Sequence, residues 1–376
     1  MMKQKYSKKH RGLVGALAIF VFGLVTCGFV LADTKTANST PEILFPVPEK
    51  QASIESPDLN VIKNPVMHWA DTSRKLNSEG EPVPYSKDPC VVKFGDRYLM
   101  YFSLPPTDHK KTDYGWIIGI AESTDLINWR TIAELPPMQQ CDAKGLCAPC
   151  ARVWDGKVHL FYQTYGNGKN DAICYASSEN GVDFTPHPQN PIFQPSGNWN
   201  CGRAIDADVF LFNGKLLLYA ATRCPEMKVQ KLVVAAADPN SDYGPDCWTQ
   251  LCDDSILEPQ LPWEKLCIEA STVCRRGDQL VMFYAGGYNN DPQQIGVAVS
   301  DDGVKWVRLW DVPFISNGKP GDWNHSESGH PGAFVDEDGR TYLFYQGNSD
   351  RGKTWFLSQI ELDWNGVKPF VKDRSQ

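Results

Sequence analysis

The sequence lacks most of the features that mark helical, nucleic-acid-binding or nucleotide-using proteins. Long amphipathic helical patterns are scarce, which argues against a helix-rich fold. Basic residues are outnumbered, with 37 Lys and Arg against 45 Asp and Glu, and a net charge of −8 disfavours a nucleic-acid partner. There is no Gly-rich phosphate loop, no His-Glu-x-x-His and no Gly-x-Ser-x-Gly. The sequence therefore lacks the usual motifs of nucleotide-binding proteins, zinc peptidases and serine hydrolases.

What the sequence does contain is a short apolar strand that recurs five times, at intervals of about sixty residues. Hydrophobic residues make up 42% of the chain, which is enough for a large core. The five apolar strands span residues 98–102, 158–162, 216–220, 280–284 and 342–346. A repeat of this length with several strands in each unit predicts an all-β fold, a five-bladed β-propeller over residues 61–376.

Each apolar strand has the same neighbours along the chain. A strand precedes it and ends at a glycine turn, and a third strand follows it. The turns fall at Gly95, Gly156, Gly214, Gly277 and Gly339. The third strands span residues 117–121, 172–176, 232–236, 295–299 and 355–359.

The first sixty residues do not belong to this repeat. Five basic residues precede an unbroken apolar run from Gly12 to Ala32, which is typical of an export signal. The run is about twenty residues long, so residues 1–32 are either a signal peptide or an N-terminal membrane anchor. Both alternatives predict export to a periplasm or the extracellular space, with membrane contact only through an uncleaved segment. Residues 33–60 are rich in Pro, Ser, Thr and Lys and are expected to form a linker or extended arm.

Eleven of the twelve cysteines follow the apolar run, and in an exported protein they predict disulfides. The sequence does not define their connectivity, and the odd number leaves at least one thiol unpaired. In a bacterial periplasm, several would instead serve as small buried hydrophobic side chains. The closest-spaced candidates for pairing are Cys141, Cys147 and Cys150, then Cys247 with Cys252, and Cys201 with Cys224.

Three carboxylates stand at matching places ahead of the apolar strands. Asp88 and Asp206 each lie ten residues before such a strand, and Glu269 lies eleven residues before another. A propeller arranges the first strand of each blade around its axis, so these side chains are expected to face a common cavity. Burial and mutual repulsion drive the pKa values of neighbouring carboxylates apart, so that one acts as an acid and another as a base. Hydrolysis of a glycosidic bond needs such a pair, about 6.5–9.5 Å apart when the reaction inverts.

Over about residues 61–365 the chain resembles the five-bladed propellers of glycoside hydrolase family 43. The resemblance rests on Asp88-Pro89, Ile205-Asp206 and Ile268-Glu269-Ala270. It implies a glycosidase in which Asp88 is the general base, Glu269 the general acid, and Asp206 adjusts the pKa of Glu269 and orients it. The implied substrate is a plant or algal oligosaccharide or polysaccharide, cleaved with inversion at arabinose, xylose or galactose.

Departures from the family pattern keep other interpretations open. Family members usually have proline where this chain has Ala207 and Ser271, and Asp208 is a second candidate for adjusting the acid. Family 117, whose exo-acting enzymes release anhydrogalactose from agar fragments, is also similar and would use a histidine acid, here His325 or His330, with Glu327 nearby. A non-catalytic, glycan-binding propeller is the third interpretation, since a fold does not fix a function.

Further residues are candidates for binding. By the resemblance, His330 would lie beside a central metal ion or water, so that a single calcium ion is an option although no cofactor is required. Arg203 is a candidate for holding a sugar hydroxyl or carboxylate. Trp116 and Trp199 are the tryptophans chosen as sugar-stacking walls, although packing between blades is the common alternative for a tryptophan.

Overall fold

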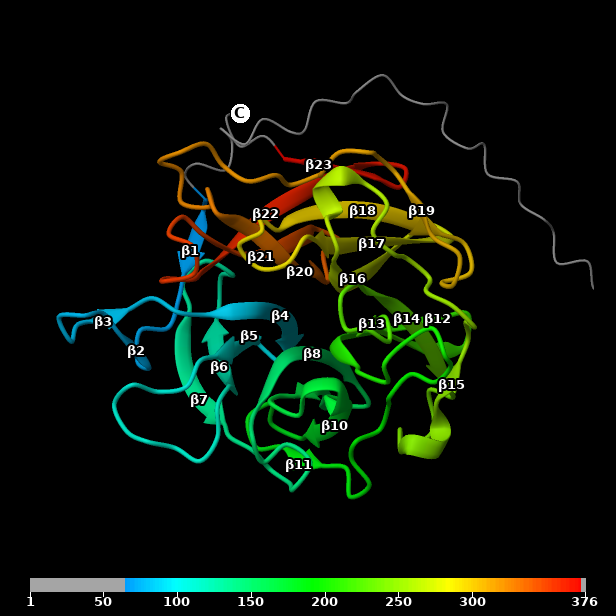
Figure 1. Cartoon of the computed structure of the whole chain (residues 1–376), viewed down its shortest axis with the longest axis horizontal. Coiled ribbons are helices and arrows are strands. Elements are labelled where there is room, and N and C mark those ends of the chain that lie inside the picture. Colours follow the sequence, from blue (N-terminus) through cyan, green and yellow to red (C-terminus); the bar gives the residue numbers. More distant parts are fainter. Residues whose placement is uncertain (1–64, 373–376) are drawn as a thin grey trace, which may run out of the picture. The chain divides into compact units, whose positions relative to one another are not determined.

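The structure, a computed structural model, describes residues 65–372. The predicted signal or anchor, residues 1–32, and the predicted linker, residues 33–60, lie outside the described residues. The described residues form five larger antiparallel sheets around a central axis (Figure 1). This arrangement confirms the prediction of an all-β, five-bladed β-propeller.

Each blade is an antiparallel sheet whose strands follow one another from the axis outward. Blade 1 contains β4 (Lys87–Phe94), β5 (Arg97–Leu104), β6 (Ile117–Ser123) and β7 (Arg130–Leu135). Blade 2 contains β8 (Leu146–Trp154), β9 (Lys157–Thr164), β10 (Ile173–Ser178) and β11 (Thr185–Pro186). Blade 3 contains β12 (Ile205–Phe212), β13 (Lys215–Arg223), β14 (Gln230–Ala237) and β15 (Thr249–Gln250). Blade 4 contains β16 (Ile268–Arg276), β17 (Gln279–Gly286), β18 (Gln294–Ser300) and β19 (Val307–Arg308). Blade 5 contains β20 (Glu327–Val335), β21 (Thr341–Asn348), β22 (Phe356–Asn365), β23 (Lys368–Val371) and β1 (Met67–Trp69).

Little else in residues 65–372 is regular. A small hairpin pairs β2 (Lys75–Leu76) with β3 (Pro82–Val83). Three 3₁₀ turns are present, η2 (Gly168–Asn170), η3 (Pro245–Cys247) and η4 (Pro262–Glu264). Within this described range, no helix has the length and apolar character needed to cross a membrane.

The second strand of every blade is one of the five predicted apolar strands, which confirms the repeat. The five predicted turn glycines all have positive φ, between 63° and 84°. Glycine adopts this conformation without steric cost, which explains why it stands in each tight hairpin. Local spacing and turn chemistry therefore account for the inner three strands of each blade.

Ring closure differs from the prediction. The blades were expected to begin near residue 61, in chain order, but the first described strand, β1, belongs to the last blade. It pairs with β22 through Met67 and Gln359, at the outer edge of blade 5. Pairing β1 with β22 covers an edge of the last sheet that would otherwise offer unpaired backbone groups.

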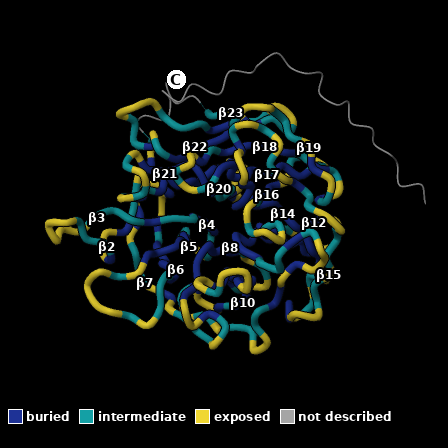
Figure 2. Tube along the Cα trace, viewed as in Figure 1, coloured by how far each residue is buried: buried dark blue, intermediate teal, exposed yellow. Residues whose placement is uncertain are grey.

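The hydrophobic core is divided among the five contacts between neighbouring blades. Each contact holds one cluster of buried side chains, such as Leu217, Met282 and Trp306 between blades 3 and 4. Figure 2 shows this buried interior and the exposed hairpin loops around it. The second strand of each blade adds one fully buried tyrosine, namely Tyr101, Tyr162, Tyr219, Tyr284 and Tyr345. Truncating an aromatic side chain this deeply buried costs about 3–5 kcal/mol, so the wedge-like packing of blades is a main source of stability.

Every innermost strand carries a β-bulge at the same place, where its pairing with the second strand shifts. The bulged residue has positive φ although none of the five is glycine. These residues are Asp88 (55°), Ala148 (47°), Asp206 (52°), Ala270 (49°) and His330 (44°). Left-handed backbone costs about 1–2 kcal/mol at a non-glycine residue. The bulge re-aims the side chain, which is a common use of bulges near active sites.

The predicted disulfides are wrong for the described residues, because all eleven cysteines there are free. The sulfur atoms of Cys141 and Cys174, for example, are separated by 3.9 Å, far beyond the ~2.05 Å of an S–S bond. Cys147 and Cys150 lie on either side of the blade 2 bulge, both of them buried. Most of the buried thiols therefore serve as the small hydrophobic side chains of the other alternative.

Candidate active site

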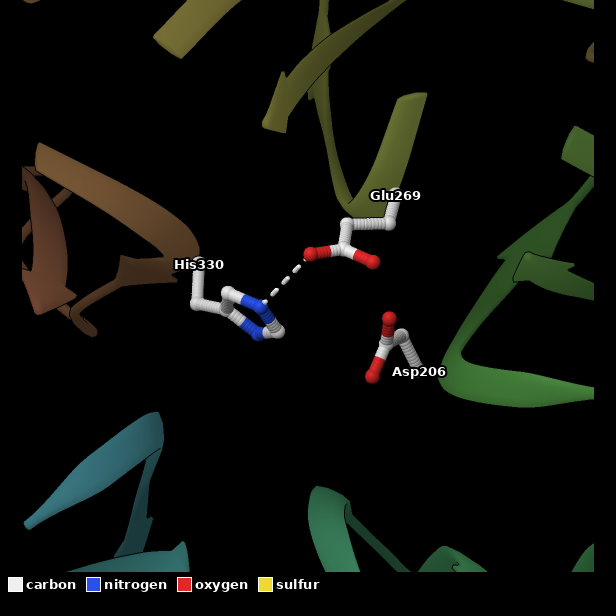
Figure 3. A group of neighbouring side chains, drawn as sticks. All are labelled: Asp206, Glu269 and His330. Atoms are coloured by element: carbon white, nitrogen blue, oxygen red, sulfur yellow. Dashed lines mark hydrogen bonds and ion pairs between the residues drawn. The ribbon is translucent and has the colours of Figure 1, made fainter. Parts of the chain in front are cut away.

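The five bulges bring side chains from different blades to the propeller axis. Asp88, Asp206 and His330 occupy the bulges of blades 1, 3 and 5. The expectation that all three carboxylates share one register is wrong, because Ala270 and not Glu269 occupies the bulge of blade 4. Glu269 precedes the bulge by one residue, and its side chain nevertheless points toward Asp206 and His330 (Figure 3).

His330 joins two of the carboxylates. Its Nδ1 lies 2.8 Å from Oδ1 of Asp88, and its Nε2 lies 3.2 Å from Oε1 of Glu269. The two carboxylate oxygens can therefore be no farther apart than one imidazole ring and two such contacts, on the order of 8 Å, which overlaps the 6.5–9.5 Å of an inverting pair. All three side chains are largely shielded from solvent.

Opposite charges fix the protonation of Asp88 and His330. Burial alone would raise the pKa of Asp88, but the positive charges of His330 and Lys87 outweigh it and hold the pKa well below its usual range. Burial alone would lower the pKa of His330, but Asp88 and Glu269 raise that pKa well above its usual value. Asp88 is therefore an ionised carboxylate paired with an imidazolium.

Glu269 and Asp206 titrate as a neighbouring pair with opposite tendencies. Burial favours the neutral form of Glu269, yet hydrogen bonds and charge from His330 and a hydrogen bond from Gln293 lower its pKa. Burial raises the pKa of Asp206 to about 7, and the charges of Glu269 and Asp88 add to this rise while His330 opposes it. Oδ2 of Asp206 is buried without a hydrogen-bond partner among the described residues. The pair therefore retains one proton up to about neutral pH, and that proton resides mainly on Asp206.

Four buried glutamines hold these residues, and sequence reasoning missed all of them. Two act on the backbone of the bulges: Oε1 of Gln346 accepts from the Asp88 N–H at 3.0 Å, and Oε1 of Gln163 accepts from the Asp206 N–H at 2.8 Å. Two act on Glu269, whose carboxylate accepts from Nε2 of Gln230 and, at 2.7 Å, from Nε2 of Gln293.

Lys87 is a further residue that the sequence did not single out. It stands in blade 1 where Glu269 stands in blade 4, one residue before the bulge. Its Nζ donates to Asn289 at 3.0 Å and lies 4.4 Å from the centroid of the Trp355 ring. Burial would lower the pKa of Lys87, but nearby carboxylates, first Asp88, raise it. The resulting ammonium supports the ionised form of Asp88.

A small cavity of about 40 Å³ lies on the axis among the bulges. This volume holds water, which needs about 10–15 Å³ on the same measure, but not a sugar ring. Below it, Arg152 forms an ion pair with Asp208, and Oδ2 of Asp208 accepts from the Val273 N–H at 2.8 Å. Asp208 is thereby committed to the scaffold, which removes it as a rival to Asp206.

The side chains of Asp206, Glu269 and His330 could each turn one ligand atom toward a metal, all within 4.8 Å of one another. Calcium takes six to eight oxygen ligands, and this set supplies two carboxylates and one imidazole. Both imidazole nitrogens are already engaged with carboxylates. This donor set therefore does not by itself make up a calcium site, which needs more oxygen ligands than it supplies.

The other predicted residues fall at different distances from this centre. Arg203 contacts Gln230 and lies in the wall of the site. Trp116 lies beside Lys87, with its ring centroid 5.8 Å from Nζ of that lysine. Trp199 packs against the core between blades 2 and 3, with Nζ of Lys231 at 5.0 Å from its ring centroid. His325 is exposed, with its ring nitrogen 3.2 Å from the carbonyl of Gly318.

Glu327 is buried near the centre. It accepts hydrogen bonds from the Asn290 N–H and, at 2.8 Å, from Nε2 of Gln346. Burial raises its pKa to about 7, against the positive charge of Lys87. Gln346 also accepts a hydrogen bond from the Asp88 N–H. Glu327 therefore stabilises the site indirectly, by fixing the side chain of Gln346.

Comparison with known proteins finds a family and a set of structures with the same fold. The family model described as Glycosyl hydrolases family 43 matches residues 80–367. A thermostable family-43 glycoside hydrolase superposes with a TM-score of 0.60 at 19% identity, covering 77% of this chain and 94% of the other. An endo-1,4-β-xylanase from Bacteroides thetaiotaomicron gives a TM-score of 0.59 at 18% identity, with 81% and 97% covered. An exo-1,5-α-L-arabinanase from a bovine ruminal metagenomic library gives 0.56 at 16% identity, with 77% and 97% covered.

Proposed function

The chain belongs to glycosyl hydrolases family 43, and from this premise we propose that it cleaves a glycosidic bond of a plant or algal oligosaccharide or polysaccharide with inversion. The proposed sugar at the cleavage point is arabinose, xylose or galactose. One observation carries the proposal, the contact of His330 with both Asp88 and Glu269 on the propeller axis. The two carboxylates contact opposite nitrogens of one ring, and the resulting upper limit of about 8 Å on their separation falls within the 6.5–9.5 Å range of an inverting pair.

In this mechanism Asp88 is the general base. Its pKa lies well below the usual range, so it is ionised at neutral pH and can accept a proton from water. The water oxygen then forms a bond to the anomeric carbon as the bond to the leaving oxygen breaks. His330 balances the negative charge of Asp88 in the resting state.

The acid is the pair of Glu269 and Asp206. The single proton of the pair moves from Asp206 to Glu269, which donates it to the leaving oxygen, and the proton that Asp88 takes from water is released to solvent as the pair takes up another. Substrate that covers the site removes water from Glu269 and favours its neutral form. The lowered pKa of Glu269 in the free enzyme is thus offset by its neighbour.

A histidine acid, as in family 117, has one observation in its favour. His330, unlike the exposed His325, lies in direct contact with the carboxylates. In that alternative the imidazolium would protonate the leaving oxygen, and Glu269 would only hold the ring. Replacing each residue separately distinguishes the two mechanisms.

We propose further that the protein is exported and that hydrolysis needs no metal. Export rests on the basic and apolar residues 1–32. Independence from metal rests on the donor set of the site, which offers two carboxylates and one imidazole whose two nitrogens both contact carboxylates.

The test is hydrolysis of nitrophenyl arabinosides, xylosides and galactosides and of natural plant and algal oligosaccharides, assayed with a chelator present. We expect turnover of at least one substrate and a fall in kcat of about 10²–10⁴-fold in Glu269→Gln. Glu337→Gln, at an exposed surface ion pair, is the matched control and should retain full activity. An undiminished Glu269→Gln together with an inactive His330→Gln would favour the histidine acid, and binding without turnover of any substrate would contradict hydrolysis.

A further inference from the structure

Two arginines meet at one buried amide in the wall of the active site. Nε of Arg223, at the end of β13, donates to Oε1 of Gln230 at 2.7 Å. Nη1 of Arg203 approaches the same oxygen at 3.4 Å. Gln230 is fully buried, at 0% exposure, so its amide is a fixed element to which both guanidinium groups are tied.

The charges of these arginines are incompletely balanced. Arg203 has one carboxylate in reach, Oδ2 of Asp171 at 3.4 Å. Arg223 has no carboxylate within 4.0 Å among residues 65–372, and its guanidinium carbon lies 5.1 Å from the centroid of the Tyr288 ring. A guanidinium carries five N–H donors, and described groups use one of those on Arg223. Both side chains are partly exposed, so the remaining donors are open to a ligand.

Gln230 also connects the two arginines to the proposed acid, Glu269. The amide that accepts from both guanidinium groups donates through Nε2 to Oε2 of Glu269. The two cations therefore lie one amide group away from the acid. A ligand group held by them would belong to the sugar at the cleavage point or to its immediate neighbour.

We propose that Arg203 and Arg223 bind an anionic substituent of the glycan, a carboxylate or a sulfate ester, beside the scissile bond. Planar guanidinium groups bind such oxyanions in a bidentate way and more strongly than they bind hydroxyl groups. The inference rests on the proposed function, since it names the substrate class of the same site. The chain as a whole is acidic, at −8, so the selectivity is a contact effect and not long-range attraction.

The test measures binding to the full chain by calorimetry with two matched pairs of probes. Oligogalacturonate and its methyl ester differ only in the carboxylate charge, and a sulfated galacto-oligosaccharide and its desulfated form differ only in the sulfate. We expect the anionic member of one pair to bind about tenfold or more tightly. The pair that shows the preference identifies the anion. Equal affinity within both pairs would overturn the proposal.

Variants locate the effect. Arg223→Gln should abolish the preference, Arg223→Lys should keep part of it, and Arg275→Gln, at an exposed position near the end of β16, should keep all of it. A preference that survives in folded Arg223→Gln would overturn the assignment. Hydrolysis assays on the same probes separate this inference from the proposed function. Anion-selective binding without hydrolysis would support the anion site and contradict the proposed hydrolytic function. Hydrolysis without any anion preference would support the proposed function and contradict the anion site.

Discussion

Blades 2 and 3 have the same innermost-strand geometry but carry different side chains on it. In blade 2 the bulged residue is Ala148, whose N–H donates to Oγ of Ser103 at 2.8 Å. In blade 3 it is Asp206, whose N–H donates to Oε1 of Gln163, also at 2.8 Å. The left-handed conformation, with φ of 47° and 52°, is almost unchanged.

The comparison shows that the bulge is a general feature of the propeller blades. Only the side chain at the bulge differs between a blade that contributes to the site and one that does not. Ala148 has the strained backbone without any polar side chain to aim, so the strain alone does not identify a site. Around the ring, Ser103, Gln163 and Gln346 hold the bulge of the next blade. Glutamine stands at this position only ahead of the two aspartates.

The largest expected effect is the difference in activity between a substitution at the bulge of blade 1 and one at the bulge of blade 2. Asp88→Asn removes the base but keeps a residue that tolerates left-handed backbone, and kcat should fall about 10²–10⁴-fold with the fold intact. Ala148→Gly alters the same backbone position without removing a reacting group. It should keep most activity and change the free energy of unfolding by less than about 1 kcal/mol. Similar losses in initial rate for both variants would break the comparison.

A smaller effect is expected from the glutamine behind Asp206. Gln163→Leu leaves the Asp206 N–H without its acceptor, which costs about 1–3 kcal/mol for a buried group and lets the bulge shift. We expect kcat to fall about tenfold with little change in KM, because orientation and not sugar binding is lost. Gln163→Glu keeps an acceptor oxygen and should recover part of the rate. An unchanged kcat in folded Gln163→Leu would show that the glutamine does not position the acid.

The smallest effect concerns the pH dependence of stability. The pKa of Asp206 is raised by burial to about 7 in the folded protein, so its contribution is fully favourable below its ordinary pKa and is lost as pH rises through 7. Asp206→Asn should therefore lose less thermal stability than wild type between pH 5 and pH 8. The difference in Tm should reach several degrees, since one pKa unit corresponds to about 1.4 kcal/mol. Ala148→Gly, with no titrating group at the bulge, should follow wild type.

The strands, the blade number and the three carboxylates could be read from the sequence because local periodicity and turn chemistry encode them. The offset of Glu269 had a signal, since its spacing of eleven residues differs from the ten of Asp88 and Asp206. Gln163 directly follows one predicted apolar strand, but its partner lies in the next blade, and a lone glutamine at a strand end has many ordinary explanations. Contacts between blades depend on the assembled ring and leave no local pattern.

Closure of the ring by β1 has a consequence for how the enzyme becomes active. Blade 5 carries His330, and its outer edge is completed by residues that lie almost 300 positions earlier in the chain. Such distant pairing is slow, because the entropy of a long loop is lost before any contact is gained. Hydrolytic activity should therefore appear only after β1 has paired with β22, which keeps chains without a complete blade 5 inert.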